Sequence, residues 1–139
     1  MDKFADFTGY LSIALFLALG FRYVLKAYFK KVSKQLDPQS TQFKNLTSIL
    51  AFNKAAHPYL GFLVLVVIGV HAYLQTGFVL SFSRTQISGM MAFALMSLNV
   101  ISGVFGQYIF KKPRPKYWLS IHRGLTALIF VAILIHYYA

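Results

Sequence analysis

The chain has 139 residues, of which 58% are hydrophobic and 17% are aromatic. A soluble domain of this length cannot bury so much apolar side chain, so the composition predicts a membrane protein. The net charge of +11 comes from basic residues between apolar stretches, which argues against a nucleic-acid-binding surface.

Four apolar segments are each about long enough to cross the hydrocarbon core of a bilayer, at residues 7–29, 57–76, 86–110 and 117–138. We therefore expect an all-α membrane protein in which four transmembrane helices form an up-and-down bundle, as a single domain over residues 1–139. Acidic residues and no basic cluster precede the first segment, so we expect it to be retained rather than cleaved as a signal peptide.

The segment between the first two crossings begins at Asp37-Pro38, which is a turn and helix-start signal. The apolar residues of the following stretch, QFKNLTSILAFNK, partly follow a helical stripe. Two interpretations stay open: a short helix lying at the membrane interface, or a continuation of the second crossing beyond the membrane. Between the last two crossings, two prolines within residues 111–116 cannot continue a helix and predict a stiff connector.

The basic residues are concentrated in these same two segments. They are Lys26, Lys30, Lys31, Lys34, Lys44 and Lys54 around the first, and Lys111, Lys112, Arg114 and Lys116 in the second. By the positive-inside rule, both segments face the cytoplasm, while both termini and the 77–85 loop face outward. We expect an integral protein of a bacterial or archaeal cytoplasmic membrane.

The four histidines form two matching pairs along the chain. His57 and His71 lie fourteen residues apart in the second crossing, and His122 and His136 repeat this spacing in the fourth. Fourteen residues of α-helix rise about 21 Å and make two heptads. Both histidines of one helix therefore face the same neighbouring helix. Because both helices run outward, His57 pairs with His122 at the inner level, and His71 with His136 at the outer level.

Such pairs suit two stacked haems. Ionisable groups at membrane depth are costly and commonly functional, although a single histidine can equally be a packing residue. Bis-imidazole ligation of iron leaves no open position and suits electron transfer. The absence of cysteine excludes thiolate-ligated clusters and covalent haem attachment, and the three acids lie outside the spans, which argues against zinc or di-iron carboxylate sites. The pattern predicts two non-covalent haem b groups.

Gly89 and Gly103 on the third crossing are also fourteen residues apart. We expect them to lie opposite the two iron levels and let a flat macrocycle approach the backbone, with small-residue helix packing as the alternative. For Gly9 and Gly20 on the first crossing, packing is the favoured interpretation.

Several cations are candidate partners for haem propionates through charge-assisted hydrogen bonds. Arg123 and Lys54 are expected near the inner haem and Arg84 near the outer one, with interfacial anchoring as the alternative. Arg22 is expected to extend toward the interface, and propionate binding stays open for it.

These features resemble the four-helix dihaem core of b-type cytochromes: H-x13-H on the second and fourth helices and paired glycines on the third. Two families share this core, the cytochrome b of quinol-oxidising bc complexes and the ferric reductase and NADPH oxidase-like proteins. The stretch WLSIHRG, residues 118–124, is similar to the aromatic-x-x-x-His-Arg pattern of small members of the second family. The resemblance covers residues 55–138. The flavin domain of the reductases and the quinol-site loop of the bc protein have no counterpart here.

We therefore expect transmembrane electron transfer through two bis-histidine b-type haems, as the membrane subunit of a redox complex, with no catalytic side chain. Its redox partner would be another subunit or a membrane quinone. One alternative is an oxidoreductase acting on quinone or ferric substrate beside a haem, with Ser97, Asn99 and Ser102 as lining or as interhelical hydrogen-bond groups. Another is a haem-free anchor or assembly subunit.

Overall fold

The computed structural model describes residues 2–77, 79, 82–106 and 116–139, and these residues form four α-helices. The helices are α1 (Asp2–Val32), α2 (Thr41–Thr76), α3 (Arg84–Val104) and α4 (Lys116–Tyr138). Each is long and apolar enough to span a membrane. The expectation of an all-α protein with four candidate transmembrane helices is confirmed.

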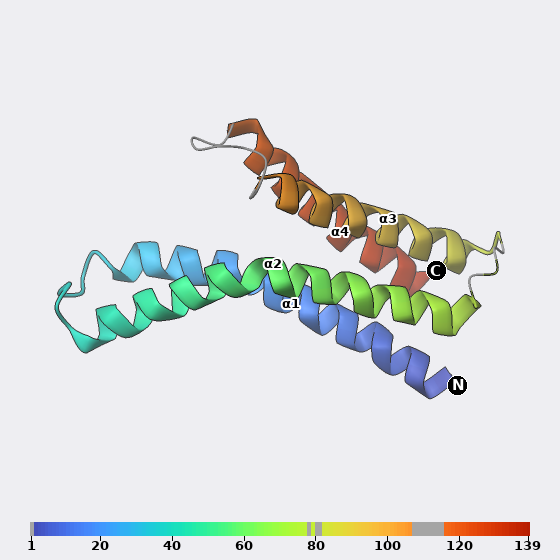
Figure 1. The fold of residues 1–139 in the computed structure, drawn as a ribbon, viewed down its shortest axis with the longest axis horizontal. Helices are drawn as coiled ribbons and strands as arrows, with labels where there is room; N and C mark the ends of the chain where they lie inside the picture. Colours follow the sequence, from blue (N-terminus) through green and yellow to red (C-terminus); the bar gives the residue numbers. More distant parts are fainter. Residues whose placement is uncertain (1, 78, 80–81, 107–115) are drawn as a thin grey trace.

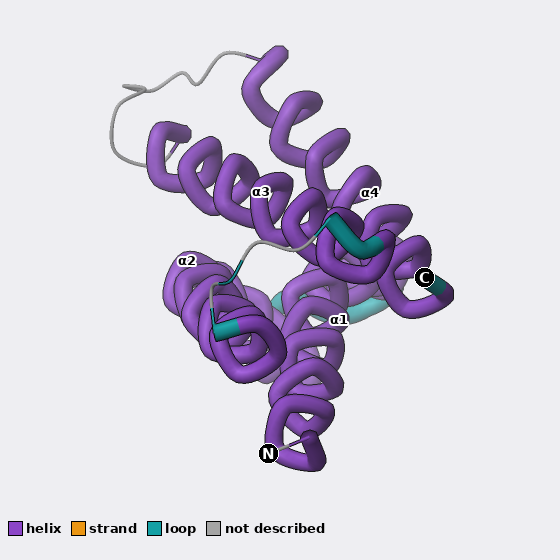
Figure 2. The backbone as a smooth tube through the Cα atoms, turned by 90° about the vertical axis from the view of Figure 1, so that its right-hand side faces the viewer, coloured by secondary structure: helices purple, strands orange, loops and turns teal. Residues whose placement is uncertain are grey.

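The helices alternate in direction, and each packs on the next in the chain: α1 on α2, α2 on α3, and α3 on α4. Figure 1 shows both termini at one end of the molecule, so α2 and α4 run the same way. Seen nearly along the helices, α2 and α4 occupy opposite corners of the bundle (Figure 2). Residues on α2 and α4 can therefore face each other across the bundle interior.

The helix that contains the second predicted crossing is longer than residues 57–76, because α2 begins at Thr41. Residues 42–54 thus continue the second crossing and do not form a separate interfacial helix. Ser40 caps this helix, since its side chain accepts a hydrogen bond from the amide of Phe43 at 3.2 Å. The rings of Phe29 and Phe43, 5.8 Å apart, join the extension to α1. Pro58 inside α2 removes one backbone hydrogen bond, and the helix bends (Figure 1).

The other predicted boundaries lie closer to the observed ones. α1 covers Asp2–Val32 rather than 7–29, α3 begins at Arg84 rather than 86, and α4 begins at Lys116 rather than 117. Gly77, with φ 56°, ends α2 in the left-handed conformation that glycine adopts easily. The predicted end of the third helix at 110 and the connector at 111–115 lie outside the described residues.

The most buried side chains form a layer halfway along the bundle. Val64, Met96 and Ile129 are 0%, 1% and 1% exposed, and Phe16 and Leu19 of α1 complete the cluster. Val64 lies seven residues from each histidine of α2, and Ile129 seven from each histidine of α4. The apolar layer therefore separates the two histidine levels.

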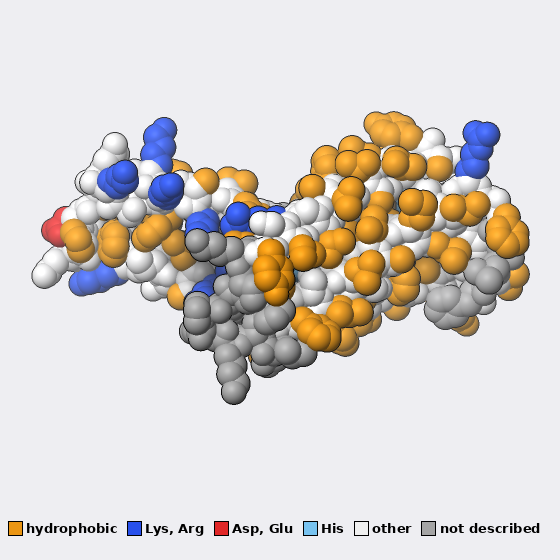
Figure 3. All heavy atoms as spheres, turned by 90° about the horizontal axis from the view of Figure 1, so that it is seen from above, with side chains coloured by type: hydrophobic (Ala, Val, Ile, Leu, Met, Phe, Trp, Pro, Cys, Tyr) orange, Lys and Arg blue, Asp and Glu red, His pale blue; other side chains and the backbone are white. Residues whose placement is uncertain are grey.

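Lysine and arginine side chains gather at one end of the face shown in Figure 3, whereas hydrophobic side chains cover most of the remaining length. We call the end that carries Lys26, Lys30, Lys31 and Lys34 the basic end. The opposite end, where both chain termini lie, is called the terminal end.

Candidate metal centres

The structure brings the four histidines together in the two pairs that their spacing predicts. The ring centres of His57 and His122 lie 6.4 Å apart with an interplanar angle of 75°. Those of His71 and His136 also lie 6.4 Å apart, at 80°. We call His57 and His122 the basic-end pair, and we call His71 and His136 the terminal-end pair. Each pair joins α2 to α4 across the bundle interior.

This separation fits two imidazoles on opposite sides of one metal ion. A histidine nitrogen binds a first-row metal at about 2 Å, and the ring centre lies roughly 1.2 Å beyond that nitrogen, which together place two opposed ring centres about 6.4 Å apart. Among the described residues, no group of three or more His, Cys, Asp or Glu side chains could hold a metal ion. Each pair can thus supply two imidazole ligands to one metal ion.

A three-part contact with α1 orients His71. Its Nδ1 donates to the carbonyl oxygen of Ala5 at 2.9 Å and lies 3.4 Å from the Thr8 hydroxyl. That hydroxyl itself donates to the Ala5 carbonyl at 2.7 Å. A Cβ atom added at Gly9 would lie only 3.0 Å from Cε1 of His71. We call this combination of carbonyl, hydroxyl three residues later, and following glycine an imidazole cradle.

A second cradle on α3 holds His136. Its Nδ1 donates to the carbonyl oxygen of Thr85 at 3.1 Å and lies 3.2 Å from the Ser88 hydroxyl. Ser88 donates to the Thr85 carbonyl at 2.9 Å, and a Cβ atom at Gly89 would lie 3.0 Å from Cε1 of His136. The terminal-end pair is therefore held by equivalent cradles from α1 and α3.

A third cradle, one repeat further along α3, holds His122. The Ser102 hydroxyl donates to the carbonyl of Asn99 at 2.8 Å and lies 2.9 Å from Nδ1 of His122. A Cβ atom at Gly103 would lie 3.4 Å from Cε1 of His122, which is ordinary contact. This cradle is slightly looser than the two at the terminal end.

The cradles determine which ring nitrogen faces the partner histidine. A carbonyl oxygen can only accept, and each cradle hydroxyl already donates its proton to a carbonyl, so Nδ1 is the protonated nitrogen in all three rings. Nε2 then keeps its lone pair, which is the arrangement of a metal-binding histidine with an outer hydrogen bond.

The glycines therefore have a more specific position than predicted. Gly89 lies against the imidazole of His136, and Gly103 lies against that of His122. Gly9, assigned to packing from the sequence, has the same position at His71, while Gly20 has open space. The hydroxyl–glycine dipeptides at residues 8–9, 88–89 and 102–103 were the sequence signal that was missed.

The fourth position is different. Fourteen residues after Thr8 and Gly9 on α1 stand Arg22 and Tyr23 in place of a hydroxyl and a glycine. Arg22 is half-buried, and its charge acts on both His57 and His122. The basic-end pair thus has a cation where the terminal-end pair has a second cradle.

Trp118 supports the basic-end pair from within α4. Its ring stacks on His122, one helical turn away, with ring centres 5.7 Å apart and planes 15° from parallel. Its Nε1 donates to the carbonyl oxygen of Ser102 at 2.7 Å. A Cβ atom at Gly106 would lie 1.8 Å from Cε2 of Trp118, so the tryptophan occupies the space that the glycine leaves.

The terminal-end pair borders a cavity of about 860 Å³, lined by residues of all four helices. His71, His136, Gly9 and Gly89 are among the lining residues. This volume lies within the usual range for sites that bind small molecules and cofactors. The space beside this pair is therefore sufficient for a flat macrocycle.

The predicted propionate partners lie at the surface. Arg123 is exposed and places its guanidinium 5.7 Å from the ring centre of Tyr23. Lys54 is exposed on α2, and Arg84 is exposed at the start of α3, next to the cradle carbonyl of Thr85. Their roles stay predictions.

The polar residues in the middle of α3 make hydrogen bonds within the bundle. Asn99 donates to the Thr126 hydroxyl on α4 at 3.2 Å, and Ser102 belongs to the His122 cradle. Ser97 donates to the backbone of its own helix at Phe93. Asn99 and Ser102 thus connect α3 to α4.

The fold and site define a class: an all-α protein with four helices able to span a membrane and two facing histidine pairs in its interior. In comparisons with known proteins, the chain matches no family model, no curated protein and no solved structure.

Proposed function

We propose that this chain is a membrane dihaem cytochrome that transfers electrons across the bilayer through two bis-histidine b-type haems. The observation that carries the proposal is the pair of 6.4 Å ring separations, one at each level of the bundle. Each pair would supply two imidazole ligands to the iron of one haem. Three of the four imidazoles also keep Nε2 free through their Nδ1 hydrogen bonds.

In this proposal, His57 and His122 hold one haem, and His71 and His136 hold the other. Bound haem supplies a reversible one-electron couple at its iron. With two histidines from the chain as ligands, each iron would have no open position for a small molecule, which would favour electron transfer. The apolar layer of Val64, Met96 and Ile129 excludes water from the interval between the two levels.

The two sites differ in their electrostatics. We assign the cation of the basic-end haem to Arg22 in preference to Arg123, because Arg22 is half-buried and acts on both histidines. A fixed positive charge favours the reduced, less positive state of a haem. Arg22 would therefore raise the potential of a haem bound at the basic-end pair.

We further propose that the basic end faces the cytoplasm, in accordance with the positive-inside rule. The chain would act as the membrane subunit of a redox complex, with a partner subunit or a membrane quinone exchanging electrons with it. The extension of α1 and α2 at the basic end, seen in Figure 1, offers a basic surface for an acidic partner.

Pyridine haemochrome analysis of the purified full chain tests the proposal. We expect two non-covalent protohaems per polypeptide. His57→Ala and His122→Ala should remove the same spectral component, and His71→Ala and His136→Ala the other. A folded protein purified from haem-replete cells without haem, and unable to bind added haemin, would show that the histidines are packing residues of an anchor subunit.

A further inference from the structure

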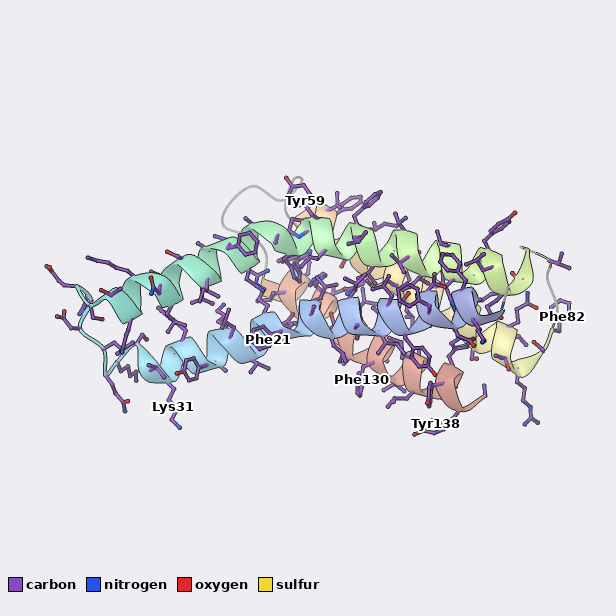
Figure 4. The ribbon with its side chains drawn as sticks, turned by 90° about the horizontal axis from the view of Figure 1, so that it is seen from below. Phe21, Lys31, Tyr59, Phe82, Phe130 and Tyr138 are labelled. Carbon is purple, nitrogen blue, oxygen red and sulfur yellow. The ribbon has the colours of Figure 1, made fainter. Side chains whose placement is uncertain are left out.

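A groove lies between α1 and α4, the first and last helices of the bundle. Its volume is about 980 Å³. Phe16, Phe130 and Val131 are among its apolar lining residues, and its cations are Lys26, Lys30 and Arg123. Figure 4 shows Phe130 on α4 alongside α1. None of the four histidines lines this groove, so it is distinct from the candidate metal centres.

The lining residues are ordered by depth. Phe16 and Lys26 are ten residues apart on α1, a rise of about 15 Å, which is half of the roughly 30 Å hydrocarbon core. On α4, Arg123 lies six residues from Ile129 of the central layer, toward the basic end, whereas Val131 lies only two residues from Ile129. Both walls therefore run from the central apolar layer of the bundle to the basic end, where they are cationic. A bilayer centred on that layer would place the groove within one leaflet.

The positive charge of the groove has no carboxylate to balance it. The chain contains three acidic residues, Asp2, Asp6 and Asp37, and none of them lines the groove. Arg123 is held over the ring of Tyr23, a residue type that favours the membrane interface. The unbalanced cations and the interfacial tyrosine therefore favour binding of an anion at the level of the lipid headgroups.

We propose that this groove binds one anionic phospholipid, with its phosphate at Lys26, Lys30 and Arg123 and an acyl chain along Phe16, Phe130 and Val131. A second copy of the chain fits less well, since a two-fold interface would place these cations against their own copies. The bound lipid would connect α1 to α4 along the open side of the bundle. This inference goes beyond the proposed function and does not depend on haem binding.

Native mass spectrometry of the full chain in detergent can measure binding of phosphatidylglycerol and of phosphatidylcholine with the same acyl chains. The test variant is the triple substitution Lys26→Gln, Lys30→Gln, Arg123→Gln. The matched control is Lys31→Gln, Lys34→Gln, Lys44→Gln, which removes three charges from the same end but outside the groove. Figure 4 shows that Lys31 points away from the bundle.

We expect the groove triple to weaken phosphatidylglycerol binding by about one hundredfold and the control triple by less than about twofold, because each cation beside an anionic headgroup contributes roughly fivefold. Ala127→Trp, which fills the groove without changing charge, should also weaken binding, whereas Leu128→Trp on the neighbouring exposed surface should not. Circular dichroism checks that each variant is folded.

Four outcomes would overturn the proposal. They are equal weakening by both triples, equal affinity for the two lipids, full competition by inorganic phosphate, and a stable dimer that masks the groove. Unchanged binding by folded Ala127→Trp protein would also refute the acyl-chain position.

Discussion

Gly89 lies against the imidazole of His136, so closely that a Cβ atom at position 89 would come within 3.0 Å of Cε1 of that ring. Gly89 lies near the start of α3 and His136 near the end of α4, so the two residues are far apart in the sequence. The ring is also tied to α3 through Nδ1, so it cannot easily move aside. This contact places one candidate ligand, and it explains why a glycine is needed at this level.

Gly89→Ala should therefore displace His136 and remove the terminal-end haem, lowering haem content from two per chain to one. Gly69→Ala is the matched control, because nothing lies within 4 Å of its added Cβ. Alanine favours the helix over glycine by about 1 kcal/mol, so the control should keep both haems and melt slightly higher. Equal haem loss in both variants would contradict the cradle contact.

Ser102→Ala removes the hydroxyl that lies 2.9 Å from Nδ1 of His122. Loss of such an outer hydrogen bond typically weakens metal binding by about 10- to 100-fold, so haem should dissociate faster from the basic-end pair alone. Ser97→Ala is the control, since Ser97 bonds to its own helix. Haem transfer to apomyoglobin, followed spectroscopically, measures both rates. Identical rates for the two variants would show that the Ser102 contact has no orienting role.

Arg22→Gln should lower the midpoint potential of the basic-end haem. A unit charge near the site at an effective dielectric constant of 20 is worth roughly 1 to 2 kcal/mol, which is about 40 to 90 mV for one electron. Redox titration followed at the haem bands measures this shift, and Arg123→Gln is the comparison variant. A larger shift for Arg123→Gln would reverse our assignment of the two arginines.

Gly106→Ala would place a Cβ atom within 1.8 Å of Cε2 of Trp118. Trp118 is stacked on His122 and bonded to Ser102, so we expect a loss of about 1 to 3 kcal/mol of stability and a disturbed basic-end spectrum. Gly124→Ala, with open space around its added Cβ, should leave the spectrum unchanged and melt slightly higher, as expected for Gly69→Ala. Thermal melting and haem absorption provide the two readouts. If Gly106→Ala protein kept its thermal stability and its basic-end spectrum, Trp118 would have room to move.

The sequence was sufficient to predict the four crossings and the histidine pairs. Long apolar runs have few alternatives to membrane-spanning helices, and a fourteen-residue spacing returns a side chain to the same face of a helix. It could not choose between an interfacial helix and an extended α2, because both show the same stripe. The Ser40 cap and the contact of Phe43 with Phe29 favour the longer helix.

The surroundings of the histidines depended on the tertiary structure. The Ala5 carbonyl and His71 lie 66 residues apart in the chain, so only the packing of α1 on α2 brings them together. Arg123 follows His122 directly in the sequence, and we expected it to contact a propionate of an inner haem. Successive residues of a helix point about 100° apart, however, so Arg123 faces the groove beside α1. Arg22, on a different helix, acts on the basic-end pair because the bundle places α1 beside both histidine helices at that level.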